Sequence, residues 1–133
     1  MQPKISHLDH VVLTVADIAT TVNFYRDGLG MQDETFFPED GTRRTALKFA
    51  SGKINLHQAG AEFSPRAYHP VPGSGDLCLI TETPLETWLL HLASVGIDVI
   101  EGPVPRAGAS GDMMSIYVRD PDGNLVEIAK YDR

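Results

Sequence analysis

Four polar side chains stand at matching places in the two halves of this sequence. His10 and Asn55 lie in apolar segments of the first half, and Asp76 and Glu127 lie in the corresponding segments of the second half. An imidazole, two carboxylates and an amide oxygen are donor types that hold divalent metal ions in proteins. A metal ion held in this way could polarise the oxygens of a small molecule, so these four residues form the candidate site.

The two halves of the chain follow one plan, which indicates a duplicated module. The sequence at 9–13, Asp-His-Val-Val-Leu, is matched at 75–79 by Gly-Asp-Leu-Cys-Leu. The sequence at 53–56, Lys-Ile-Asn-Leu, is matched at 125–128 by Leu-Val-Glu-Ile. A module with one potential ligand on its first strand and another on its last strand can form a metal site together with its copy.

Apolar periodicity predicts the order βαβββ in each half, and hence an α+β fold. In the first half we expect a strand at 8–15 and then a helix that is capped by Asp17 and ended by Gly28 and Gly30. Two strands within 33–49, joined by a turn at 38–41, and a strand at 53–58 follow. In the second half we expect a strand at 76–81 and then a helix, for which Thr83 is the cap, Pro84 takes the first position and Glu86 completes a capping box. A strand at about 97–100, a Gly/Pro-rich loop at 102–112 and strands at 113–119 and 124–130 follow. The chain of 133 residues is expected to form a single domain, 1–133, with module one at about 6–59, a linker at about 60–74 and module two at about 75–131.

Strand parity tests whether the four side chains can meet. Successive side chains of a strand point to opposite faces. In each strand that carries a candidate ligand, the purely apolar face suits packing against a helix and the candidate points the other way. By the same count, further side chains line the cavity: Arg44, Lys48, Met113, Ser115 and Tyr117. This mixture of polar and apolar groups is typical of a small-molecule site.

Each candidate also has a simpler interpretation. Asp76 follows a glycine-rich turn and could be a plain turn residue, and Asn55 could pair with the backbone. Glu127 is the hardest to explain in this way, because a carboxylate in an apolar strand needs a partner. His57 lies on the cavity face two residues beyond Asn55, either as a ligand or at the rim of the site.

Composition excludes several kinds of partner. The chain is 42% apolar and 22% charged, and its net charge of −7 argues against nucleic acid and anionic membranes. No signal peptide is expected from the first ten residues, and no apolar run reaches the roughly 20 residues that span a bilayer. The single cysteine, Cys78, is expected to be a small buried side chain, and a reduced, cytoplasmic setting fits.

Several segments carry a family likeness. The opening at 7–18, His-Leu-Asp-His-Val-Val-Leu-Thr-Val-Ala-Asp-Ile, and the close at 120–124, Asp-Pro-Asp-Gly-Asn, with Glu127 resemble the vicinal-oxygen-chelate superfamily. That superfamily includes glyoxalase I, methylmalonyl-CoA epimerase, fosfomycin and bleomycin resistance proteins and extradiol dioxygenases. More narrowly, the chain resembles a glyoxalase-domain-containing subgroup in four segments: 53–58, 69–74, 101–106 and Gly108-Ala109.

The resemblance implies paired βαβββ modules that form an open, strongly curved sheet around a metal cavity. It also implies metal ligands at His10 on the first strand, Asn55 on the fourth and Glu127 on the last. The fifth-strand position, often His or Gln in the family, is Asp76 here. One His with two carboxylates differs from the two-His, one-carboxylate set of iron-based oxygen chemistry, and it favours Mn²⁺ or Mg²⁺, with Zn²⁺, Ni²⁺ and Fe²⁺ as further candidates.

We therefore expect a metal-dependent lyase or isomerase of glyoxalase type. One divalent ion would be held by His10, Asp76 and Glu127, with Asn55 or His57 completing the shell, and Asp76 or Glu127 would act as the base. The alternatives are a small-molecule-binding protein without catalysis, like the drug-sequestering resistance proteins, and, less favoured, an extradiol-type dioxygenase.

The substrate and the assembly are also expectations. Arg44 and Lys48 on the cavity face, with Arg106 in a glycine-rich loop, predict that the small-molecule substrate carries an anionic group. The resemblance implies a homodimer, with the cavity closed either within one chain or across two.

Overall fold

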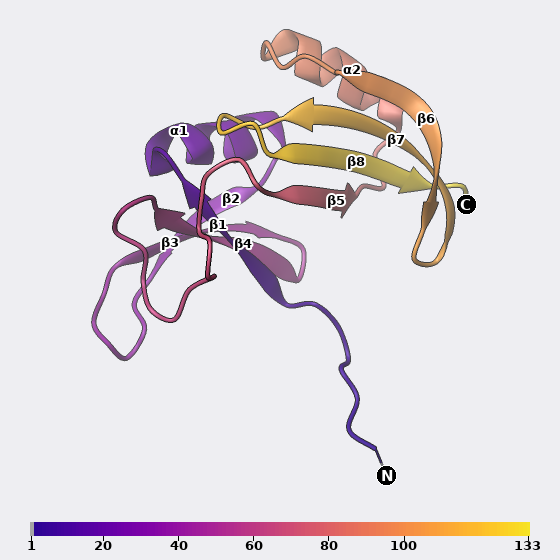
Figure 1. Ribbon diagram of the computed structural model, residues 1–133. Coiled ribbons are helices and arrows are strands. Elements are labelled where there is room, and N and C mark those ends of the chain that lie inside the picture. The colour runs from indigo at the N-terminus through magenta and orange to yellow at the C-terminus, as the bar shows by residue number, and fades with distance from the viewer. Residues whose placement is uncertain (1) are drawn as a thin grey trace. The chain divides into compact units, whose positions relative to one another are not determined.

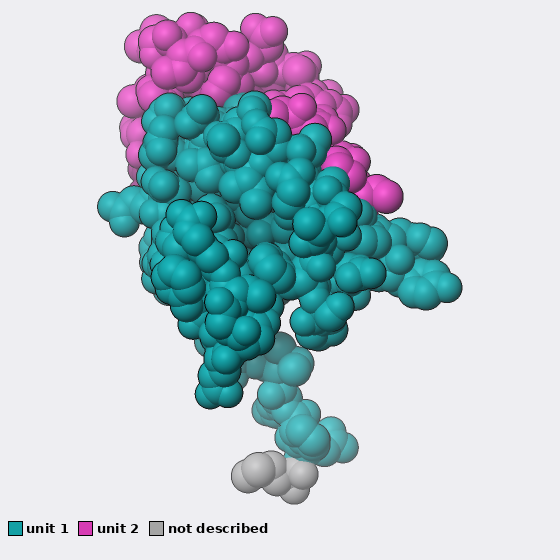
Figure 2. Space-filling view, turned by 90° about the vertical axis from the view of Figure 1, so that its left-hand side faces the viewer, with its two compact units in different colours: residues 1–70 teal, residues 71–133 magenta. Residues whose placement is uncertain are grey.

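The duplicated plan appears directly in the three-dimensional structure. The computed structural model describes residues 2–133, and the chain divides into two compact units, Met1–Pro70 and Val71–Arg133 (Figures 1 and 2). Each unit contains one open sheet of four strands with the first strand beside the fourth. The repeated βαβββ order and the α+β fold class are therefore confirmed.

The first unit consists of β1 (His10–Val15), α1 (Ile18–Asn23), the π-helical turn η1 (Phe24–Gly28), β2 (Gln32–Phe36), β3 (Arg44–Phe49) and β4 (Gly52–Gln58) (Figure 1). The sheet order is β1-β4-β3-β2, with β1 parallel to β4 and the other pairs antiparallel. As predicted, Asp17 caps α1, because its carboxylate accepts a hydrogen bond from the amide of Thr20. Gly30 follows the helical segment with φ at 77°, a conformation that favours glycine.

Alternation along the strands separates a buried face of this sheet from an open face. Val15, Leu47, Ile54 and Leu56 on the strands, and Tyr25 on η1, are at most 1% exposed. Burial of each such side chain stabilises the fold by about 1.5–3 kcal/mol. The apolar face of the sheet is therefore the buried one. The side chains of the alternate residues point to the open face, where they can make other contacts.

The second unit consists of β5 (Asp76–Ile80), α2 (Leu85–Ser94), β6 (Glu101–Gly108), β7 (Gly111–Arg119) and β8 (Leu125–Tyr131), with the sheet order β5-β8-β7-β6 (Figure 1). The turn between β7 and β8 depends on Asn124, which is 1% exposed. Its amide nitrogen donates to Oδ2 of Asp120 at 2.8 Å, and its Oδ1 accepts from the amide of Gly75 at 2.6 Å. Asn124 therefore fixes both the hairpin and the start of β5.

Three local predictions were wrong. No strand forms at 97–100; the edge strand β6 runs through the predicted loop at 102–112 instead. Prolines are tolerated on an edge strand because an amide there need not join the ladder, so Pro103 and Pro105 do not prevent it. At α2 the cap position is Pro84 and no side chain caps the helix there, so the capping box with Thr83 does not form. Cys78 is exposed, because it lies on the edge strand β5 and on the face opposite the buried Val126 and Ile128.

Candidate functional site

The open face of the first unit's sheet carries the candidate residues of that half. The parallel register places side by side His10 and Lys53, Val12 and Asn55, and Thr14 and His57. The antiparallel register of β3 and β4 pairs Lys48 with Lys53 and Ala46 with Asn55. Side chains two residues apart share a face, so His10, Asn55, His57, Arg44 and Lys48 all belong to one face.

Asn55 and His57 each contain a buried atom without a partner. Among the described residues, neither Oδ1 of Asn55 nor Nδ1 of His57 has a hydrogen-bond partner. Burial lowers the pKa of His57, and the positive charges of Arg44 and Arg66 lower it further, against the opposite effect of Glu62. The imidazole is therefore neutral at pH 7. Unpaired buried polar atoms are costly, and at a native site they indicate a ligand, an ion or water.

His10 is oriented by a residue that the sequence interpretation did not single out. Its Nδ1 donates to Oδ1 of Asp9 at 2.8 Å, and this hydrogen bond lowers the pKa of Asp9. A carboxylate on one ring nitrogen fixes the tautomer and leaves Nε2 as the donor atom for a metal ion. The position of Asp9, directly before His10, was the available signal.

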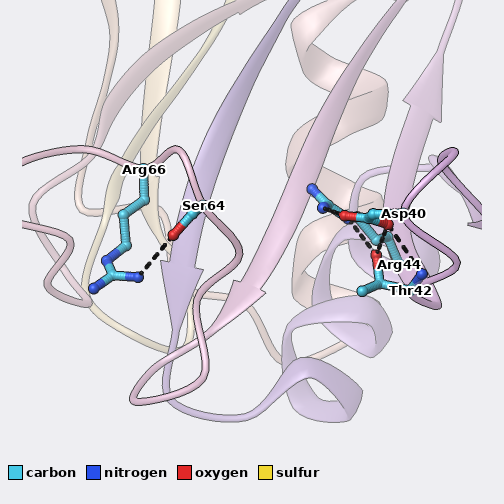
Figure 3. A network of polar contacts seen from close by, with 5 residues as sticks. All are labelled: Asp40, Thr42, Arg44, Ser64 and Arg66. Carbon is cyan, nitrogen blue, oxygen red and sulfur yellow. Dashed lines mark hydrogen bonds and ion pairs between the residues drawn. The ribbon is translucent and has the colours of Figure 1, made fainter.

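Arg44 already has a carboxylate partner. Its Nη2 donates to Oδ2 of Asp40 at 2.8 Å, and its Nε donates to Oγ1 of Thr42 at 2.9 Å (Figure 3). Its guanidinium also lies over the ring of Phe63, 4.0 Å from the centroid. The charge predicted to attract a substrate is therefore partly compensated within the first unit.

The open face of the second unit's sheet carries the other candidates. The register pairs Cys78 with Glu127 and Glu127 with Tyr117, and Asp76 is two residues from Cys78 on the same strand. The same parity places Met113 and Ser115 on this face, and both side chains are buried.

Glu127 is held in place by a neighbouring hydroxyl group. Oγ of Ser115 donates to Oε2 of Glu127 at 2.6 Å. Partial loss of hydration, then the charges of Glu127 and Asp76, raise the pKa of the Cys78 thiol to about 11. None of the ion pairs formed by residues 2–133 includes Asp76 or Glu127. The face therefore carries an uncompensated negative charge.

Arg106 does not lie in a loop. It belongs to β6, where its Nη2 contacts Oε2 of Glu101 at 2.7 Å and its Nε donates to the hydroxyl of Tyr117 at 2.8 Å. The prediction of a glycine-rich loop around Arg106 was wrong because β6 extends the sheet through this segment. Like Arg44, Arg106 is already paired with a carboxylate.

Neither unit contains a ready-made metal cluster: in the described chain, no three His, Cys, Asp or Glu side chains are grouped so that they could hold an ion. The ligand set His10, Asp76 and Glu127 draws on both units and remains a prediction. In residues 2–133 no helix combines the length and the apolar character needed to cross a membrane.

Each unit repeats the βαβββ order and carries side chains of the metal-ligand type on its open face. This combination defines the class of proteins built from paired βαβββ modules. The chain belongs to the Glyoxalase/Bleomycin resistance protein/Dioxygenase superfamily, whose sequence profile matches residues 7–128. Virulence protein STM3117 of Salmonella typhimurium is 51% identical over 131 residues, covering 98% of this chain and 88% of that protein. Glyoxalase domain-containing protein RDO1 of Mycosarcoma maydis is 48% identical over 130 residues, and the match covers 98% of this chain and 71% of that protein. The structure VPC_CASS1 from the mobile metagenome of V. Pseudocholerae is 50% identical with a TM-score of 0.94, covering 100% of both chains.

More distant matches have names that indicate several activities. Metallothiol transferase FosB of Staphylococcus saprophyticus is 28% identical, covering 93% of this chain and 76% of that protein. Two structures at 23% identity show the fold alone. Lactoylglutathione lyase from Agrobacterium tumefaciens has a TM-score of 0.68, and the match covers 96% of this chain and 95% of that chain. The antibiotic binding protein TnmS3 from Streptomyces has a TM-score of 0.73, with 97% of this chain and 98% of that chain covered.

Proposed function

We propose that this protein is a metal-dependent lyase or isomerase of glyoxalase type that acts on a small, oxygenated, anionic metabolite. One divalent ion is held by His10, Asp76 and Glu127, and Asn55 or His57 completes the shell. The observation that carries the proposal is the pair of uncompensated carboxylates, Asp76 and Glu127, on the open face of the second sheet. A concentration of negative charge of this kind attracts a cation.

The donor atoms fit a divalent ion. Glu127 is oriented by Ser115 at 2.6 Å and His10 by Asp9 at 2.8 Å, which is how ligands of metal sites are commonly positioned. Asn55 adds an amide oxygen that is buried and unpartnered within the described residues. One nitrogen with several oxygens suits Mn²⁺ or Mg²⁺ and is compatible with Zn²⁺, Ni²⁺ and Fe²⁺.

The ion would supply Lewis-acid polarisation of adjacent substrate oxygens, which acidifies a neighbouring C–H group. Asp76 and Glu127 then serve as candidate proton acceptors. Oε2 of Glu127 accepts the hydrogen bond of the Ser115 hydroxyl, so Oε1 would be the metal-binding oxygen and could accept a proton only after leaving the ion. Asp76 is exposed and can move a proton to or from solvent.

The second candidate function is small-molecule binding without catalysis. It is favoured by the apolar side chains beside the polar candidates, since Val12 is 46% and Ile80 48% exposed on the same open faces. Such a protein resembles the fold neighbour TnmS3, an antibiotic binding protein. A dioxygenase is disfavoured, because Asp76 stands where a second histidine would be needed.

The test is the metal content of protein purified without a chelator or a nickel column. We expect about one divalent ion per chain, and affinity measured by calorimetry should be lost in the double variant His10→Ala with Glu127→Ala. The matched control is His7→Ala with Glu86→Ala, which changes one exposed residue of each type. Unchanged affinity in the first double variant would show that the ligand assignment is wrong, and metal-free wild-type protein that binds small molecules would favour the second candidate.

A further inference from the structure

The second unit contains a pocket on the face of its sheet that is turned away from Glu127. The pocket has a volume of about 410 Å³, and its lining includes Met114 of β7 and Lys130 of β8. These two residues pair in the register and share a face with the buried Ile116 and Ile128. The pocket is therefore separate from the candidate metal site, whose residues belong to the open faces.

The pocket lies at the beginning of α2. This helix lies on one side of the second unit's sheet and begins at Leu85, so it does not cover the strand residues beyond its first turn (Figure 1). Pro84 and Leu85 line the pocket from the helix, and Pro103 and Met114 line it from the sheet. Proline rings restrict the backbone, so these walls are largely formed before a ligand binds. The volume and the apolar walls are typical of a small-molecule site.

Two opposite charges line this pocket without a counterion. Lys130 is half-buried, and Asp132 follows it by two residues. None of the ion pairs formed by residues 2–133 includes either of them.

The other two charged residues of the pocket are already engaged. The guanidinium of Arg133 lies over the ring of Tyr131, 4.4 Å from its centroid. Glu86 belongs to the first turn of α2, where the helix dipole stabilises a negative charge. One ammonium group and one carboxylate, those of Lys130 and Asp132, are left for a ligand.

We propose that this pocket binds a small zwitterion with an apolar body, of the chemical class of the free apolar α-amino acids. The carboxylate of the ligand pairs with Lys130, its ammonium group pairs with Asp132, and its side chain packs on Met114 and the two prolines. A ligand with a single charge satisfies only one of the two protein groups. The site uses no metal and is independent of the proposed function.

The first experiment locates the ligand through the methionines. Chelator-treated full-length protein with ¹³C-labelled methionine methyl groups is titrated with L-phenylalanine and, separately, with L-leucine. We expect a saturable shift of the Met114 methyl resonance with at least one of them, and no shift of Met113, its neighbour on the open face. If neither amino acid moves Met114, the proposal is overturned, whatever the metal content of the protein. A shift of Met113 alone would place the ligand on the open face and overturn it as well.

Analogues then test the two charges of the ligand. Phenylpropanoate and phenylethylamine each lack one charged group of phenylalanine, and isocaproate and isoamylamine each lack one of leucine. Each analogue should bind at least about tenfold more weakly than its parent amino acid, the loss expected for one hydrogen bond between charged groups. An acid or an amine that binds as tightly as its parent would make the pocket a site for a simple anion or cation and contradict the proposal.

Variants assign the charges to their partners. Lys130→Gln and Asp132→Asn should each weaken binding of the active amino acid about tenfold in calorimetry. In Lys130→Gln the amine analogue should bind nearly as well as the amino acid, and in Asp132→Asn the acid analogue should do so. Lys4→Gln and Asp98→Asn change exposed residues of the same types and are the matched controls. Wild-type affinity in Lys130→Gln and Asp132→Asn would show that these residues do not bind the ligand.

Discussion

The hydroxyl of Ser115 donates a hydrogen bond of 2.6 Å to Oε2 of Glu127, from the neighbouring strand β7 to the middle of β8. Ser115 is fully buried, so this hydrogen bond is shielded from competing water. The bond fixes one oxygen of a carboxylate whose charge has no cationic partner in the described chain. Ser115, predicted to line the cavity, thereby becomes the residue that positions Glu127.

Ser115→Ala should therefore weaken divalent-metal binding. Loss of a residue that orients a metal ligand commonly costs about 10- to 100-fold in affinity, and we expect a loss at the lower end because Glu127 itself remains. Calorimetry with Mn²⁺ measures the effect. Ser110→Ala, in the turn between β6 and β7, is the control, and equal affinities in both variants would show that Ser115 does not position a ligand.

Cys78 reports the charge of the second open face. Its pKa of about 11 predicts that the thiol is alkylated at pH 8 roughly a hundredfold more slowly than a thiol with the reference pKa of 9.0. Glu127→Gln removes a charge that raises this pKa, so alkylation at pH 8 should become several-fold faster, and Glu86→Gln on α2 should have no effect. Iodoacetamide kinetics between pH 7.5 and 9.5, in the presence of a chelator, measure both rates. A wild-type rate equal to that of a free thiol would contradict the charge assignment.

A bound divalent cation should lower the pKa of Cys78, because it compensates Asp76 and Glu127. Metal addition is therefore expected to accelerate alkylation of wild-type protein at pH 8 and to have little effect on the Glu127→Gln variant. The same iodoacetamide assay with and without Mn²⁺ is the measurement. An unaltered wild-type rate at saturating metal would place the ion away from this face.

Asp9→Asn should weaken metal binding about tenfold, because the histidine loses the carboxylate that fixes its tautomer. Glu39→Gln removes the same charge from an exposed position in the first unit and should leave the affinity unchanged. Calorimetry separates a local effect from a general loss of negative charge. Equal losses in both variants would indicate that only net charge matters.

We predict a homodimer, to be tested by light scattering at micromolar concentration. If each site joins the first unit of one chain to the second unit of its partner, a mixture of His10→Ala and Glu127→Ala chains regains part of the metal binding that each lacks alone. A heterodimer then contains one site with all its ligands. A monomer by light scattering would contradict the prediction, and failure of the mixture to regain binding in a dimer would place each site within one chain.

Asn124→Ala should destabilise the protein by about 1–3 kcal/mol, since it removes one of the hydrogen bonds to the buried carboxylate of Asp120 and the side-chain acceptor of the Gly75 amide. Urea denaturation measures the free energy of unfolding, and Asn23→Ala at an exposed position of α1 is the control. A loss no larger than that of the control would show that the turn does not depend on Asn124.

Much of the fold was determined by the sequence itself. The repeat and the strand parity predicted the βαβββ order and the open faces that carry His10, Asn55, Asp76 and Glu127, because a period of two is a local property of extended chain. The two errors that concern strands occurred where the prediction depended on position in the sheet. β6 forms despite two prolines because it is an edge strand, and Cys78 is exposed because β5 is an edge strand as well.

The partners of the charged side chains were decided by the tertiary structure alone. Arg44 and Arg106 were predicted to face a substrate, and the register indeed places them on the open faces, but each guanidinium is paired with a carboxylate, Asp40 or Glu101. Whether a charge is compensated depends on which residues neighbouring strands and turns bring within about 3 Å, and no local periodicity encodes that. For the same reason only the folded chain shows that Nδ1 of His57 is buried without a partner in the described residues.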